Sequence, residues 1–183
     1  MEQTKTLVIL SPGFAKDEQD TTCLPPQQIF VRALNKNFHS LKIFILAFEY
    51  PYTSENYKWF GNDVISFNGF GKRKVLRLLL WLRVYKALRK IKKQNNLIGL
   101  LSFWCSECAI VGKNFSKRNA LKHFIWILGQ DAKKSNHYVR WIKPNSEELI
   151  ALSDFITETF FENHKVKPAH TIPIGVEATM FPV

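Results

Sequence analysis

The fold is decided by residues 97–136, which read LIGLLSFWCSECAIVGKNFSKRNALKHFIWILGQDAKKSN. Residues 97–103 are apolar and carry no charge, which is typical of a strand buried on both faces of a parallel sheet. A helical pattern begins near Cys108, and a second charge-free run follows at 124–128. Two such strands joined by a crossover of this length predict a β-α-β unit with parallel strands.

Polar residues follow both of these strands at the point where each one ends. Trp104 to Glu107 come directly after the first strand, and Gly129, Gln130 and Asp131 come directly after the second. In open α/β sheets the ligand lies beyond the carboxyl ends of the strands. We therefore expect a functional site at these two strand ends. The alternative for the second strand end is an ordinary turn capped by Asp131.

The rest of the chain continues this alternation of strands and helices. We expect further strands at 5–11, 41–48, 64–67, 152–157 and 171–176, and helices at 25–38, 72–96 and 158–164. Residues 49–62 are aromatic-rich and irregular, and residues 132–144 have the composition of a basic loop. The alternation predicts an α/β fold with a doubly wound, mostly parallel sheet and helices on both of its faces.

The composition is that of a globular and strongly basic protein. Of the 183 residues, 46% are hydrophobic, and the formal net charge is +11 with a pI of about 9.7. A charge of this sign indicates an anionic partner, which is nucleic acid, an anionic membrane surface or a phosphorylated substrate. Three cysteines and the lack of a signal-peptide pattern favour a reducing interior, so we expect a cytoplasmic protein.

The positive charge is concentrated in the predicted helix at 72–96. Ten basic side chains and no acidic one lie between Lys72 and Lys93. A basic amphipathic helix with an exposed apolar residue suits an anionic bilayer surface, and a solvated charged face on a core-packed helix is the alternative. The candidate membrane contacts are Lys86, Arg89, Lys90 and Lys93.

The longest apolar run of the chain, at 75–88, is interrupted by three basic residues. A membrane-spanning helix needs roughly 20 predominantly apolar residues. We therefore expect no transmembrane helix, and a membrane contact would be peripheral, on the inner face of the membrane.

Residues 104–108 contain a Cys-x-x-Cys spacing directly after a tryptophan. A thioredoxin-type redox site has this form, and a helix N-terminus would lower the thiol pKa of Cys105. The motif comes late in this chain, whereas that fold places it after an early strand. We therefore favour simple packing of Cys105 and Cys108, with a thiol redox protein as the alternative function.

Signals for other kinds of site are weaker. Only Cys105 and Cys108 have the spacing of zinc ligands, and a structural zinc site needs four ligands, so we expect no metal. The sequence contains neither a G-x-G-x-x-G nor a G-x-x-x-x-G-K-[ST] phosphate-binding motif. A basic module that binds a membrane surface or nucleic acid is a further alternative function. No recognised nucleic-acid-binding motif accompanies the basic surface, so we do not favour nucleic acid as a partner.

The order of these features resembles the N-terminal half of retaining GT-B glycosyltransferases of family 4. The resemblance covers nearly the whole chain, from the strand and glycine turn at 7–14 and the helix opened by Pro25 and Pro26 to the strand that ends in WILGQD at 126–131. It continues through 151–163. The sequence IPIGVE at 172–177, with Phe181, is similar to the family's junction segment of the form I-P-N-G-V-D…F.

The resemblance implies a Rossmann-like, acceptor-side domain at 1–175 and the start of an interdomain junction at 176–183. The C-terminal donor domain would lie beyond the chain, and this domain alone would be inactive. The whole enzyme would transfer a sugar from a nucleotide-sugar donor to a glycan or lipid-linked acceptor with retention of configuration. The family usually needs no metal or other cofactor, and it implies a role in cell-envelope polysaccharide biosynthesis.

The resemblance also implies roles for single residues. By position in the family's motifs, Asp131 and Gln130 are the expected catalytic residues, and Gly13 and Phe14 lie in the loop that faces the donor diphosphate. The residues expected to line the acceptor cleft are Trp104, Glu107 and Gly129.

The sequence departs from the family at Leu128, where many members have a histidine directly before the glycine. The polar contact to the donor sugar would then come from another residue. No two glutamates have the spacing of the family's donor-side E-x7-E motif, as expected if the donor half is absent.

Overall fold

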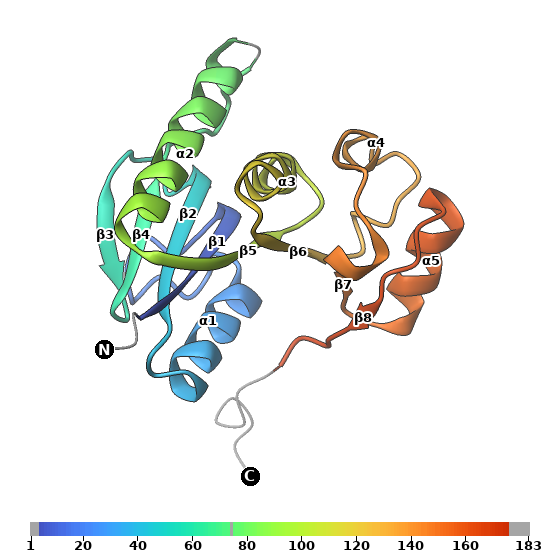
Figure 1. Cartoon of the computed structure of the whole chain (residues 1–183), viewed down its shortest axis with the longest axis horizontal. Helices are drawn as coiled ribbons and strands as arrows, with labels where there is room; N and C mark the ends of the chain where they lie inside the picture. The colour runs from blue at the N-terminus through green and yellow to red at the C-terminus, as the bar shows by residue number, and fades with distance from the viewer. Residues whose placement is uncertain (1–3, 74, 176–183) are drawn as a thin grey trace.

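The charge-free segments of the sequence form the strands of one mostly parallel sheet. The computed structural model describes residues 4–73 and 75–175, and within them eight strands pair in the order β3-β4-β2-β1-β5-β6-β7-β8. Every neighbouring pair is parallel except β3 and β4. The predicted α/β, Rossmann-like fold class is confirmed (Figure 1).

The elements alternate along the chain as the sequence predicts for such a fold. The strands are β1 (Lys5–Gly13), β2 (Lys42–Tyr50), β3 (Asn56–Trp59), β4 (Asn62–Ser66), β5 (Asn96–Phe103), β6 (Lys122–Ile127), β7 (Leu149–Ala151) and β8 (His170–Thr171). The helices are α1 (Pro25–Asn37), α2 (Val75–Gln94), α3 (Glu107–Asn119), α4 (Tyr138–Ile142) and α5 (Asp154–His164), with a 3-10 turn at Ser146–Glu148.

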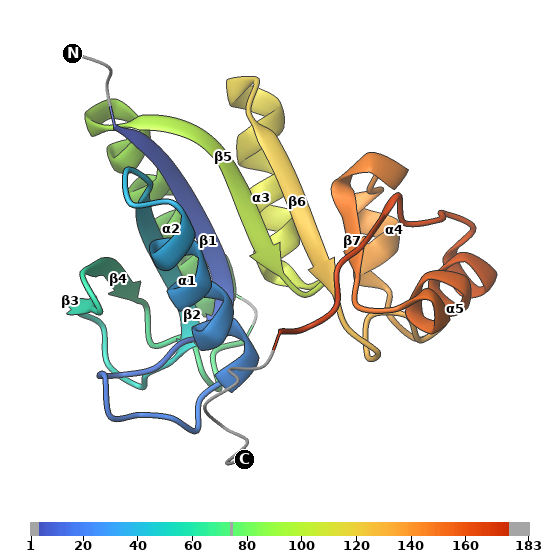
Figure 2. The same ribbon diagram turned by 90° about the horizontal axis from the view of Figure 1, so that it is seen from below.

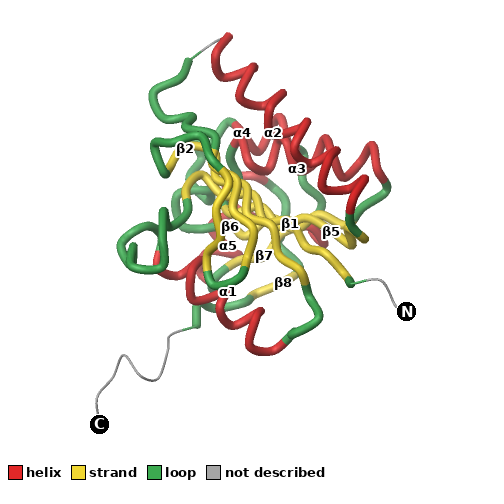
Figure 3. Tube along the Cα trace, turned by 90° about the vertical axis from the view of Figure 1, so that its left-hand side faces the viewer, coloured by secondary structure: helices red, strands yellow, loops and turns green. Residues whose placement is uncertain are grey.

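Helices cover both faces of the sheet, with α2 and α3 on one side and α1 on the other (Figures 2 and 3). Successive residues of a strand point to opposite faces, and β1 shows this directly. Val8 packs in the core cluster that contains Leu88 of α2, whereas Ile9 packs in the cluster that contains Val31 of α1. A third cluster lies between β6, β7 and the helices α3 to α5.

The predicted β-α-β unit is confirmed. β5 and β6 are parallel, with Gly99 opposite Lys122 and Phe103 opposite Trp126. The helix between them, α3, begins at Glu107. Only three residues separate the end of β5 from the start of α3, so the turn after β5 brings the helix N-terminus to the edge of the sheet.

Several predicted boundaries are wrong. Residues 49–62, expected to be irregular, contain the antiparallel hairpin of β3 and β4. The basic loop at 132–144 contains the short helix α4. No strand forms at 152–157, because β7 ends at Ala151 and α5 begins at Asp154. Of the strand expected at 171–176, only Thr171 lies in a strand, the two-residue β8, among the described residues.

The expected junction at 176–183 lies outside the described residues. In the part of the chain that is described, no helix is long and apolar enough to cross a membrane.

Candidate functional site

The strand order reverses at β1, which lies between β2 and β5. The chain leaves β1 toward β2 on one side and later returns to β5 on the other. Connections that diverge in this way leave a crevice at the carboxyl ends of the strands, and that crevice is where open α/β sheets bind ligands. The side chains that meet there come from the ends of β2 and β5 and from α2, α3 and α4.

Arg77 of α2 bridges two glutamates in this crevice. Its Nε donates to Oε2 of Glu107 at 2.5 Å, and its Nη2 donates to Oε1 of Glu49 at 2.6 Å. Burial by itself would lower the pKa of Arg77, but the hydrogen bonds and negative charges of both glutamates raise it above its ordinary value. Two carboxylates and one guanidinium give the cluster a formal charge of −1.

Glu107 is held from several sides. It is the first residue of α3, so its carboxylate lies at the positive end of the helix macrodipole. Besides Arg77, Trp81 donates from Nε1 to its Oε2 at 2.8 Å, whereas the Tyr138 hydroxyl is 3.5 Å from Oε1. Among the described contacts Oε1 has only this long one, so it is the oxygen best placed to accept a hydrogen bond from a ligand.

Three adjoining cavities lie along this edge of the sheet, and we call them the edge cleft. The central cavity, of about 210 Å³, is lined by the Glu–Arg–Glu cluster. A cavity of about 740 Å³ adjoins it beyond β6, since Trp104 and Tyr138 line both. A cavity of about 430 Å³ adjoins it in front of α2, since Arg77 lines both. Charged, hydroxyl and aromatic groups line these cavities, and polar groups placed in a cavity orient a bound ligand.

Trp104 separates two of these cavities. Its φ is +71°, in the left-handed region that is strained for a bulky residue, and such strain is typical of functional sites. Its N–H donates to the carbonyl of Trp126 at 2.9 Å, which fixes the turn. Its indole Nε1 is buried and has no hydrogen-bond partner among the described residues. Trp104 and Glu107, which the sequence places in an acceptor cleft, therefore lie in one cleft.

Asp131 is buried at the end of β6, and its expected catalytic role stays a prediction. It is 6% exposed, and both of its carboxylate oxygens accept backbone hydrogen bonds, from the N–H of Cys105 at 3.0 Å and of Leu128 at 2.8 Å. Burial raises its pKa to about 6, although these two hydrogen bonds act in the opposite direction. The carboxylate ties the end of β5 to the end of β6, so its geometry is that of a positioning residue.

The neighbours of Asp131 are open to the cleft. Gly129 and Gln130 are exposed and line the cavity of about 740 Å³. Asp131 lines the same cavity, but of the two residues expected to be catalytic Gln130 is the more exposed. In the described part of the chain, no group of three or more His, Cys, Asp or Glu is placed to hold a metal ion.

The loop position of Gly13 and Phe14 opposite a donor diphosphate stays a prediction, and neither residue is exposed. Phe14 is fully buried and packs edge-on against Trp59, with ring centroids 4.8 Å apart. Gly13 is buried beside Tyr50, and a Cβ at Gly13 would lie 3.2 Å from the Tyr50 Cβ. The ring of Phe14 belongs to the hydrophobic core cluster that contains Trp59. Gly13 permits the close approach of β1 to β2 at Tyr50.

The burial of Cys105 and Cys108 contradicts the alternative function of a thiol redox protein. Cys105 and Cys108 are each 1% exposed, and both are free thiols. Burial raises the pKa of both thiols, and the charge of Asp131 raises that of Cys105 further. A thiol of this kind does not form the exposed thiolate that exchange chemistry requires. The alternative interpretation, packing of small side chains where α3 meets the sheet, is confirmed by their burial.

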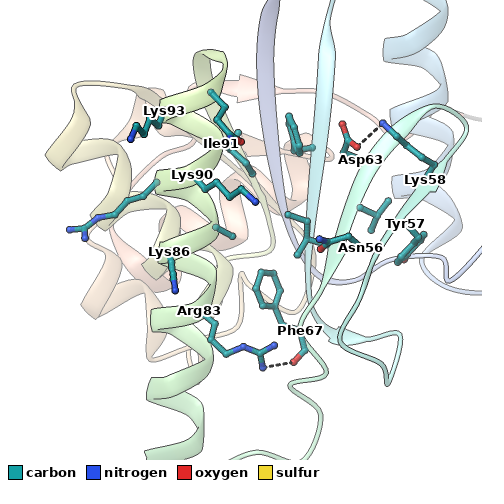
Figure 4. Close-up of a pocket in the computed structure, with 16 residues that line it drawn as sticks. Asn56, Tyr57, Lys58, Asp63, Phe67, Arg83, Lys86, Lys90, Ile91 and Lys93 are labelled. Carbon is teal, nitrogen blue, oxygen red and sulfur yellow. Dashed lines mark hydrogen bonds and ion pairs between the residues drawn. The ribbon is translucent and has the colours of Figure 1, made fainter.

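The basic residues of α2 lie apart from the edge cleft. Lys86, Arg89, Lys90 and Lys93 are exposed and line a groove of about 1050 Å³ between α2 and the β3–β4 hairpin (Figure 4). The groove and the edge cleft share no lining residue. The two surfaces can therefore serve different partners.

Arg77, Glu49 and Tyr138 were not predicted from the sequence as site residues. For Arg77 a signal exists, because it precedes the buried residues Leu80 and Val84 by three and seven positions. This spacing places Arg77 on the buried side of α2 and distinguishes it from the other cations of the helix. Glu49 and Tyr138 have no comparable signal, because only the three-dimensional fold brings them to Arg77 and Glu107.

Comparisons with known proteins support the fold. No protein-family model matches the sequence, and no curated protein matches it. Among solved structures, the chain is similar to a UGT transferase from Siraitia grosvenorii in complex with UDP, with a TM-score of 0.50 and 11% sequence identity. The match covers 95% of this chain and 50% of the transferase chain, so the present chain spans about half of that structure's length. At this identity the likeness shows the fold alone.

Proposed function

We propose that this chain is the N-terminal, acceptor-binding domain of a retaining glycosyltransferase. In this proposal residues 1–175 form the Rossmann-like acceptor-side domain, and the junction to a donor domain begins at 176. The complete enzyme transfers a sugar from a nucleotide-sugar donor to a glycan or lipid-linked acceptor. The resemblance of the sequence to family 4 and the likeness of the fold to half of a UDP-bound transferase both support it.

The observation that carries the proposal is the edge cleft at the point where the strand order reverses. Its central cavity is lined by the half-buried Glu–Arg–Glu cluster, whose carboxylates can accept hydrogen bonds from hydroxyl groups. An acceptor sugar presents hydroxyl groups, so this lining is complementary to it. The sequence of this chain contains neither of the two phosphate-binding motifs named above. This favours an acceptor over a nucleotide as the ligand of the edge cleft.

Within this proposal each residue of the edge cleft has a task. Glu107 accepts a hydrogen bond from an acceptor hydroxyl through Oε1, and Arg77 fixes the orientation of its carboxylate. Trp104 forms an apolar wall beside the sugar ring. Gln130 and Gly129 contact the acceptor or the donor sugar at the other end of the cleft. Asp131 supports the turn that carries them, and no metal or other cofactor takes part.

The test uses the product of the complete reading frame that contains these 183 residues. It is incubated with a panel of UDP-, GDP- and ADP-sugars, with and without a lipid extract, and the release of free nucleotide is measured. We expect release from one donor that increases when an acceptor is present. If the complete protein has a second Rossmann-like domain and still releases no nucleotide from any donor with any acceptor extract, the proposal is wrong.

A further inference from the structure

The outward face of α2 is apolar in its first half. The face contains Val75, Leu78, Leu79 and Leu82, which are 67%, 56%, 48% and 65% exposed. Their spacing of three, four and seven residues places them on one side of the helix. The opposite side packs in the core through Leu80, Val84, Leu88 and Ile91. These four large side chains are therefore not part of the hydrophobic core and are available to bind a partner.

The same outward face is basic in its second half. Lys86, Arg89, Lys90 and Lys93 follow Leu82 by four, seven, eight and eleven residues, and all four are exposed. At 100° per residue they lie within the same sector of the helix as Val75 and Leu82. The chain contains no acidic residue between Asp63 and Glu107. One continuous face of α2 is thus apolar toward the N-terminus of the helix and basic toward its C-terminus.

We propose that this face of α2 docks on an anionic lipid bilayer, with the apolar half inserted between the lipids and the basic half on their headgroups. An interfacial helix buries its apolar face by roughly 5–10 Å at the boundary between headgroups and acyl chains. The apolar half spans about 10 Å along the helix axis at 1.5 Å per residue. The positive charge of the basic half favours an anionic surface. Because the apolar and basic halves follow one another along the helix, we expect the helix axis to be tilted, with its N-terminal end deeper in the bilayer.

The start of α2 is the end that can reach into the bilayer. Figure 1 shows the first turns of α2 projecting beyond the edge of the sheet. Phe70, which precedes the helix, is 64% exposed, and Tyr52 beside it is 58% exposed, with ring centroids 5.1 Å apart. These two rings enlarge the apolar surface at the same end of the helix, and aromatic rings are favoured at the bilayer interface.

The groove beside α2 adds to the basic surface. Figure 4 shows Lys86 and Lys90 on the helix side of the groove and Asp63 on the hairpin side. The single acidic residue of the lining, Asp63, is paired with Lys58 at 2.6 Å, so it does not repel an anionic headgroup. Lys86, Arg89, Lys90 and Lys93 of the lining form no ion pair with a described residue, so their charges can attract headgroup phosphates.

This docking also bears on the edge cleft, and this part of the inference rests on the proposed function. The cavity of about 430 Å³ is lined by Phe70, Lys72 and Arg73 together with Arg77 and Glu107. One mouth of the edge cleft therefore lies beside the end of α2 that we place in the bilayer. The acceptor that enters there is a membrane-embedded lipid whose anionic headgroup meets Lys72 and Arg73.

The test is sedimentation of the 183-residue chain with vesicles, which needs no transferase activity. Vesicles of phosphatidylcholine with about 30% phosphatidylglycerol are compared with pure phosphatidylcholine, at about 0.05 and 0.5 M salt. The apolar variant carries Leu78→Gln, Leu79→Gln and Leu82→Gln. The basic variant carries Lys86→Gln, Arg89→Gln, Lys90→Gln and Lys93→Gln, and the matched control carries Lys36→Gln, Lys117→Gln, Lys122→Gln and Lys134→Gln.

We expect the wild type to bind anionic vesicles and to keep part of this binding at high salt. The apolar and basic variants each lose at least about tenfold in affinity, which corresponds to about 1.4 kcal/mol, whereas the matched control keeps the wild-type affinity. Binding of the apolar variant to vesicles as tight as that of the wild type overturns the proposal. The proposal is also overturned if the wild type does not bind vesicles and instead forms a dimer through this face. Light scattering would detect that dimer, and the apolar variant would not form it. Neither of these two results changes the outcome of the nucleotide-release assay, so the membrane proposal can fail while the proposed function stands.

Discussion

At the scale of single residues, Asp131 shows why a strand-end carboxylate is ambiguous in a sequence. Its position directly after an apolar strand is compatible with catalysis and with capping, and the strand-end pattern is the same for both. In the structure both oxygens accept backbone hydrogen bonds from Cys105 and Leu128, which is the arrangement of a capping carboxylate. Glu107 has the opposite arrangement, with one oxygen held by Arg77 and Trp81 and the other toward the cleft.

The burial of Asp131 predicts an unusual titration. Its pKa is raised to about 6, above the value of about 3.9 in an unfolded chain. Between these values the folded state keeps a proton that the unfolded state has lost, so the contribution of Asp131 to stability falls as the pH rises from about 4 to 6. Carbon-13 NMR of the side-chain carboxyl groups measures this pKa, and Asp131→Asn identifies the signal. A value below 4 would show that the two backbone hydrogen bonds outweigh burial.

At the scale of secondary-structure elements, the tight contact between α3 and β6 depends on one glycine. Gly112 of α3 faces the buried pair of Ser102 and His123, whose Oγ and Nε2 are 2.8 Å apart. Burial and the nearby charge of Lys113 lower the pKa of His123 to about 3, so the imidazole is neutral at physiological pH. A Cβ at Gly112 would lie 2.5 Å from His123 Nε2 and 2.8 Å from Ser102 Oγ.

We therefore predict that Gly112→Ala destabilises the protein. Overpacking of a core costs about 1–3 kcal/mol, whereas alanine in a helix interior gains up to about 1 kcal/mol over glycine. The net loss is expected to be about 1–2 kcal/mol in the free energy of unfolding, measured with urea. Asn114→Ala on the exposed side of the same helix serves as the control and is expected to be neutral or stabilising. Equal or greater stability of Gly112→Ala would contradict the predicted contact.

The sequence predicts the long elements well and the short ones poorly. β5, α3 and β6 follow from their apolar periods, because burial on both faces leaves a pattern that local sequence carries by itself. The β3–β4 hairpin was missed because its turn contains Phe60 and Gly61, both with positive φ, in place of the usual Asn-Gly. Asp154 was placed on a strand, but Ser153 accepts the Ile156 N–H and starts α5 there. Local capping decided this boundary over apolar content.

At the scale of the whole molecule, the centre of the edge cleft differs in charge from the protein as a whole. The net charge is +11, yet the centre of the cleft contains two carboxylates around one guanidinium. The strand ends that form the cleft were predicted from the sequence, since a parallel sheet brings them to one edge. Arg77, Glu49 and Tyr138 were not, because α2, β2 and α4 are far apart in the sequence and meet only in the fold.

The most direct test of the account compares Glu107→Gln with wild type in transfer by the complete protein, with Glu162→Gln on an exposed site as the control. The variant keeps the shape of the side chain and removes the charge that pairs with Arg77. We predict that kcat/KM for the acceptor falls at least about tenfold, that KM for the nucleotide-sugar is unchanged, and that Glu162→Gln behaves as wild type. A Glu107→Gln enzyme with wild-type acceptor kinetics, or with a loss confined to the nucleotide-sugar, would contradict the assignment of the edge cleft as the acceptor site.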